Sequence, residues 1–118
     1  MSDYILYHNP KWGKSKEAVS LLNQNNINYI MIEYLKNPLS VTEVITLSNK
    51  LGLSPGEFAR KSEKDFKDNN LDKIITDNNK MAISMSKFPK IMERPILVKG
   101  DKAVLGRPPE NILKLVKE

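Results

Sequence analysis

The chain has 118 residues, a formal net charge of +5 and no cysteine. This length allows one hydrophobic core, so we expect a single domain over residues 1–118. The absence of cysteine excludes disulfides, thiolate metal sites and a protein thiol as nucleophile. The sequence has no apolar run long enough to cross a bilayer and no pattern of an export signal, so we expect a cytoplasmic location without membrane contact.

The positive charge is spread along the chain instead of being gathered in one segment. Acidic residues alternate with lysines, as in KSEKDFKDNN at 61–70. This pattern is typical of a solvated lysine-rich surface, whereas nucleic-acid binders concentrate their basic residues. We therefore do not expect a nucleic-acid partner.

The first third of the chain has a strand, helix and strand pattern. DYILYHN at 3–9 alternates and predicts a strand, and INYIMIEYL at 27–35 predicts a second one. Between them, the helical spacing of Ala18, Leu21 and Leu22 predicts a helix from Ser15 onward, which the polar residues at 23–28 end. Such a unit normally gives parallel strands with a right-handed connection.

The middle of the chain, about residues 38–88, predicts a helical insert. Ser40 precedes an apolar-periodic run and has Glu43 three residues later, which is the spacing of a capping box. Further short helices are expected within 51–61, 70–79 and 80–89.

The last third returns to strands. Ile96 to Lys99 and Ala103 to Leu105 flank a Gly100-Asp101 turn, which predicts a hairpin. Residues 109–118 predict a closing helix. The whole order predicts an α/β fold with a small mixed four-stranded sheet, flanking helices and a helical insert, which is the arrangement of the thioredoxin superfamily.

The turn after the first strand predicts an anion site. Free N–H groups and the positive end of the helix dipole lie at the start of a helix, and both favour an anion. Asn9, Pro10 and Gly13 shape this loop, since Asn can bond its own backbone and Pro fixes its own φ. Ser15 is expected at or close to the helix N-cap. His8, the only histidine, either braces the loop or acts as a general acid.

Arginine is used at only three places, although lysine and arginine together number nineteen. The three are Arg60, Arg94 and Arg107. Forked guanidinium donors suit an oxyanion or a carboxylate, so we expect these residues to bind an anion. The alternative is ion pairing with acidic neighbours within three residues, which are Glu57, Glu93 and Glu110.

Five motifs, YHNPKWGKS, NPLS, LGLSPGEFARKSE, ERPILV and GRPPE, together resemble the arsenate reductase family of ArsC type, in its glutaredoxin- and glutathione-dependent branch. The chain is more distantly similar to the Spx regulators of the same fold. The resemblance implies reduction of arsenate to arsenite, with arsenate, phosphate, sulfate or glutathione as ligand. It also implies glutaredoxin or another protein as partner, no bound cofactor, and glutathione as a co-substrate or ligand.

The resemblance also assigns site residues. The family's nucleophilic cysteine corresponds to Trp12 here, with His8 and Ser15 as supporting residues, and Arg60, Arg94 and Arg107 as anion ligands. Pro95 takes the place of the cis-proline beside the active loop. No metal is expected, because the lone histidine has no companion ligands.

The missing cysteine changes the expected function. The Ser15 hydroxyl cannot form and release the sulfur–sulfur bonds that return electrons, so no catalytic set is intact. We expect a redox-inactive oxyanion or glutathione pocket that the Trp12 indole partly covers. Two alternatives stay open: direct reaction of glutathione with a bound oxyanion, and an Spx-like protein-interaction module without an anion ligand.

Overall fold

The computed structural model describes residues 4–9, 11 and 13–116, and the strands of this part all belong to one of two units of the chain. Unit 1 consists of Met1–Tyr34 and Arg94–Glu118, and unit 2 of Leu35–Glu93. Unit 2 thus includes residues 38–88, the segment expected to form a helical insert.

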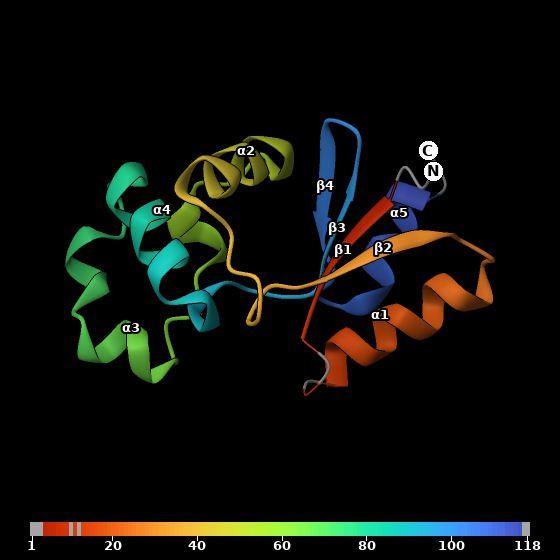
Figure 1. Ribbon diagram of the computed structural model, residues 1–118, viewed down its shortest axis with the longest axis horizontal. Coiled ribbons are helices and arrows are strands. Elements are labelled where there is room, and N and C mark those ends of the chain that lie inside the picture. Colours follow the sequence, from red (N-terminus) through yellow and green to blue (C-terminus); the bar gives the residue numbers. More distant parts are fainter. Residues whose placement is uncertain (1–3, 10, 12, 117–118) are drawn as a thin grey trace. The chain divides into compact units, whose positions relative to one another are not determined.

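Unit 1 is built on a mixed four-stranded sheet in the order β2-β1-β3-β4. Its strands are β1 (Tyr4–His8), β2 (Tyr29–Glu33), β3 (Ile96–Lys99) and β4 (Lys102–Leu105). β1 is parallel to β2, with His8 opposite Glu33, and β3 is antiparallel to both β1 and β4 (Figure 1). The four-stranded mixed sheet expected from the sequence is confirmed.

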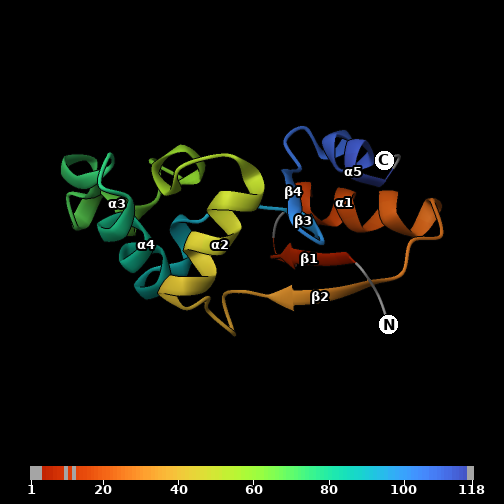
Figure 2. The same cartoon turned by 90° about the horizontal axis from the view of Figure 1, so that it is seen from above.

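Two helices pack on one face of this sheet. They are α1 (Gly13–Gln24) and α5 (Ile112–Val116), and Figure 2 shows both on the same side of the strands. The core between them and the sheet consists of fully or almost fully buried residues, namely Leu6, Ala18, Leu22, Leu97, Ile112 and Leu115. The helical stripe read from the sequence therefore faces the sheet, with Leu21 and Val19 at its margin.

Unit 2 is helical. It contains α2 (Val41–Leu51), α3 (Lys64–Asp68) and α4 (Asn78–Lys87). Short 3-10 turns at Pro55–Phe58 and Leu71–Ile74 lie between these helices, and a third at Pro89–Ile91 follows α4. The capping box of α2 is present: the Glu43 N–H donates to Ser40 Oγ at 3.1 Å, and the Ser40 N–H donates to Glu43 Oε1 at 3.0 Å. Gly52 ends α2 with φ of 69°, a conformation that glycine adopts without steric cost.

The short elements differ from the expectation in extent. Two of the three predicted helices, within 51–61 and 70–79, are single 3-10 turns, and the closing helix starts with another, Pro109–Asn111. The helix α3 was not predicted, because its charged sequence shows only one apolar residue, the buried Phe66. One buried side chain is too little for a helical period to be visible in the sequence.

Candidate anion site at the end of the sheet

One end of the unit 1 sheet gathers several of the predicted site residues. Tyr7 on β1 lies opposite Ile96 on β3, and Ile96 lies opposite Leu105 on β4. The same antiparallel registers, continued by two residues, bring Asn9, Arg94 and Arg107 to neighbouring positions just beyond the paired strands. The helix α1 starts four residues after Asn9, so its N-terminus belongs to this same end.

Backbone contacts of Gly106 hold the two arginine segments together. The Gly106 N–H donates to the Pro95 carbonyl at 2.8 Å, which extends the β3–β4 pairing past the strands. A Cβ on Gly106 would lie 2.8 Å from Pro95 Cγ and 3.1 Å from Ile112 Cγ2, so any larger residue would require Pro95 to shift. The Arg94–Pro95 and Arg107–Pro108 peptide bonds are both cis.

The turn between β1 and α1 is braced by two side chains. Asn9 Oδ1 accepts from the Lys11 N–H at 3.1 Å, which is the local bond expected of an asparagine in a turn. The Asn9 N–H in turn donates to Ser15 Oγ at 3.3 Å. Ser15 is the third residue of α1 and is fully buried, so it braces the turn instead of capping the helix.

His8 ends β1 and is 4% exposed. It has the same strand parity as Leu6, so it lies on the face covered by α1. Its Nδ1 is buried and finds no hydrogen-bond partner among the described residues. Desolvation lowers the pKa of His8 below its ordinary value, and the Lys16 charge lowers it further, while the Glu33 charge opposes the shift.

The two arginines of unit 1 differ in burial. Arg94 is 2% exposed, whereas Arg107 is partly buried. The Arg107 carbonyl accepts from Asn111 Nδ2 at 2.9 Å, which fastens the chain after β4 to the turn that leads into α5. A guanidinium placed this way loses hydration and is favoured by a nearby negative charge.

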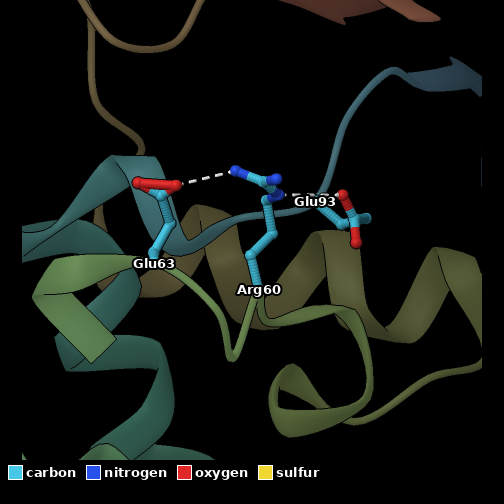
Figure 3. A network of polar contacts seen from close by, with 3 residues as sticks. All are labelled: Arg60, Glu63 and Glu93. Carbon is cyan, nitrogen blue, oxygen red and sulfur yellow. Dashed lines mark hydrogen bonds and ion pairs between the residues drawn. The ribbon is translucent and has the colours of Figure 1, made fainter. Parts of the chain in front are cut away.

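Arg60 belongs to unit 2, and two carboxylates hold its guanidinium there. Nη1 lies 2.8 Å from Glu63 Oε2, and Nε lies 3.4 Å from Glu93 Oε1 (Figure 3). Of the acidic residues named in the ion-pairing alternative, Glu93 contacts Arg60, whereas Glu57 accepts from the Ser54 N–H at 2.7 Å. For Arg60 the described contacts are therefore ion pairs, and the i,i+3 spacing to Glu63 was the signal that the sequence reading missed.

Trp12 and Pro10, named as site residues from the sequence, lie outside the described residues. Within the described ranges, no group of three or more His, Asp or Glu side chains is placed to hold a metal ion. A search of the same ranges finds no helix with the length and apolar character needed to span a membrane. Gly13, the remaining loop residue, is the first residue of α1 and is exposed.

The sheet order, its mixed pairing and the helices on one face define a thioredoxin-like α/β protein. The sequence profile of the ArsC family matches residues 7–115. This match spans nearly the whole chain, and the chain belongs to the ArsC family.

Curated relatives and solved structures agree with this membership. The arsenate reductase of Haemophilus influenzae is 35% identical, over 95% of this chain and 97% of that protein. The Escherichia coli protein YfgD is 37% identical, over 94% of each chain. A solved structure of an arsenate reductase from Vibrio cholerae superposes with a TM-score of 0.90 at 37% identity, covering 94% of this chain and 95% of that one.

Proposed function

We propose that this chain is a cysteine-free member of the ArsC family that binds an oxyanion or glutathione at the turn between β1 and α1, without reducing arsenate through a thiol of its own. The observation that carries this proposal is the absence of cysteine from a sequence that otherwise keeps the family's motifs. The relatives named arsenate reductase suggest arsenate as a ligand, and we extend this to other tetrahedral oxyanions.

The geometry of unit 1 supports the binding half of the proposal. α1 is twelve residues long and directs its first N–H groups toward the turn. The registers of β3 and β4 bring Arg94 and Arg107 to the same end of the sheet. Helix N-terminal amides and guanidinium forks are the donors that proteins use for phosphate-like anions.

The chemistry of reduction supports the other half. Arsenate becomes arsenite by accepting two electrons, which a thiol route supplies when two sulfurs end as a disulfide. This chain has no sulfur that can take part, since its only sulfur atoms are in methionine. The buried Ser15 hydroxyl cannot replace it, because an oxygen nucleophile does not donate these electrons.

Two measurements test the proposal on the unaltered chain. Arsenate, phosphate, sulfate and glutathione are titrated while the fluorescence of Trp12, the only tryptophan, is followed. A coupled assay then measures arsenate reduction with glutathione and glutaredoxin. We expect a saturable fluorescence change with at least one ligand and no turnover above the uncatalysed rate. Turnover comparable to that of a cysteine-bearing relative would contradict the proposal, as would the absence of any ligand response.

Replacing the tryptophan tests whether the other residues of the proposed site can support arsenate reduction. Trp12→Cys supplies a thiol at the position to which the resemblance assigns the family's nucleophile, and a thiol just before the first residue of a helix, Gly13 in α1, is favoured as a thiolate. We expect measurable arsenate reduction from this variant. Trp12→Ser is the matched control, since it removes the indole without supplying sulfur, and it is expected to stay inactive. Equal inactivity of both variants would mean that the supporting residues no longer form a reductase site.

A further inference from the structure

A buried histidine, His8, is the last residue of β1, directly before the turn that forms the proposed anion site. His8 is the residue before Asn9, and the Asn9 N–H is bonded to Ser15 Oγ in the first turn of α1. Pro95, which follows Arg94, is opposite His8 when the β1–β3 register is continued by one residue. His8 is therefore adjacent in sequence to Asn9, and its position across from Pro95 is one residue from that of Arg94.

The free protein disfavours a proton on this imidazole. Protonated histidine donates from both ring nitrogens, but Nδ1 of His8 has no acceptor within the part of the chain that the structure describes. The side chain is also removed from water, which raises the cost of a charge. The missing acceptor and the burial both favour the neutral form of His8 when no anion is bound, in agreement with its lowered pKa.

The neighbouring charges act on His8 in both directions: the Glu33 carboxylate favours a proton on the imidazole, and the Lys16 ammonium disfavours it. The charged side chains on the segments adjoining this end of β1 are Glu33 on β2, Lys11 in the turn, Lys14, Lys16 and Glu17 on α1, Arg94 before β3, and Arg107 and Glu110 after β4. These are five cations and three carboxylates, and of the charges that act on His8 the Glu33 carboxylate has the larger effect and favours the proton. A bound anion would act in the same direction as Glu33 and favour the proton further.

We propose that His8 takes up a proton when an anion binds at the proposed site. The affinity of the protein for the anion then rises as the pH falls. This inference rests on the proposed function. Because the coupling is electrostatic, it does not require contact between the anion and the buried ring nitrogen. By linkage, the anion must strengthen proton binding by the same factor as the proton strengthens anion binding.

Sulfate is the probe that isolates the protein's own titration. It stays a dianion through the neutral and mildly acidic range, whereas phosphate and arsenate change charge near neutrality. Sulfate is titrated by calorimetry at about pH 8 and about pH 5.5, at constant ionic strength, and we expect affinity to rise several-fold toward the lower pH, with an upper limit of about tenfold for each pKa unit that sulfate adds to His8. Buffers of different ionisation enthalpy should show proton uptake on binding.

The single histidine allows a direct reading on the unaltered chain. Its imidazole resonance is the only one in the sequence, so an NMR titration of protein freed of any histidine tag gives the pKa of His8 without assignment. We expect saturating sulfate to raise this pKa. An unchanged pKa would overturn the inference, whether or not any variant folds.

Two variants complete the test. His8→Gln removes the titrating group and should flatten the pH dependence of sulfate affinity. Lys102→Gln removes one positive charge at the opposite end of the same sheet and should leave that dependence intact. A pH dependence that persists in His8→Gln would overturn the inference, as would equal affinity at both pH values while sulfate binds. No binding at either pH would instead overturn the proposed function, and the inference with it.

Discussion

His8 and Arg94 are buried to 4% and 2% exposure, although imidazole and guanidinium groups are usually hydrated. Burial of such groups is costly unless a partner or a ligand offsets the lost hydration. Both residues lie at the end of the sheet where α1 begins. A bound anion at this end of the sheet would lower the cost of burying both groups.

Because folding favours the neutral form of His8, we expect the free energy of unfolding to decrease at acidic pH when no anion is bound. Its pKa is lowered from 6.5, mainly by desolvation. Above that value His8 is neutral in both folded and unfolded chains, so it leaves stability unchanged. Below it the unfolded chain binds the proton first, and stability falls until the pH passes the lower pKa of the folded state, with a slope of at most about 1.4 kcal/mol per pH unit.

Urea unfolding at about pH 7.5 and about pH 5.5, in chloride buffers, measures this effect. We expect the free energy of unfolding to decrease more between the two pH values in the unaltered chain than in His8→Gln. Equal decreases in both proteins would show that other groups cause the acid sensitivity.

At the scale of elements, two local devices position the site and the helices. The helix α2 begins with a reciprocal capping box between Ser40 and Glu43. The strands β3 and β4 are held together beyond their ends by the close approach of Gly106 to Pro95. Each device depends on a residue type that few others could replace.

Removing the α2 cap should destabilise the chain without affecting anion binding. Ser40→Ala leaves the Glu43 N–H without its side-chain acceptor, and such caps contribute about 1 kcal/mol. Thr42→Ala, at an exposed position two residues further on, is the control and should change stability by less than about 0.5 kcal/mol. Thermal and urea unfolding measure both. A loss in Thr42→Ala equal to that in Ser40→Ala would contradict the cap's role.

Gly106 and Gly13 in unit 1 allow a comparison of stability between a crowded and an open glycine position. A Cβ at Gly106 would lie 2.8 Å from Pro95 Cγ, whereas a Cβ at Gly13 meets nothing within 4 Å. Gly106→Ala should therefore cost about 1–3 kcal/mol by overpacking and weaken sulfate binding, because the Arg94 and Arg107 segments must separate. Gly13→Ala should be neutral or stabilising by up to about 1 kcal/mol, because α1 loses a helical glycine. Equal stability of the two variants would contradict the packing argument.

At the scale of the whole molecule, two features bear on the proposed anion site: the excess of lysines and the path of the chain through the two units. The net charge of +5 comes mostly from lysines, and those beside the site, Lys11 and Lys14, are exposed. The topology places the first and last segments of the chain in unit 1 and the middle segment in unit 2. The proposed anion site thus draws on residues separated by almost the whole sequence.

Ionic strength should act on the exposed part of this charge. The Debye length falls from about 10 Å at 0.1 M salt to about 3 Å at 1 M, so we expect sulfate affinity to decrease several-fold over this range. The double variant Lys11→Gln with Lys14→Gln should show weaker binding at low salt and a shallower dependence. Parallel salt dependences for the variant and the unaltered chain would mean that the exposed lysines do not contribute.

The sequence by itself determined the type of most long elements and the ends of several. The apolar spacing of Ala18 and Leu22 indicated the buried face of α1, and the Ser40–Glu43 spacing indicated the start of α2. These features depend on residues within one or two turns of each other, so they can be read locally. The absence of a thiol nucleophile needed no structure at all, because it follows from composition.

Only the tertiary structure decided which polar groups meet. The pairing of Arg60 with Glu93 and the burial of His8 opposite Glu33 depend on strand register or on segments distant in sequence. A local pattern cannot specify such contacts, because a one-residue change of register moves every side chain to the other face of the sheet. The pKa of His8 has the same origin, since desolvation is a property of the packed environment and not of the residue.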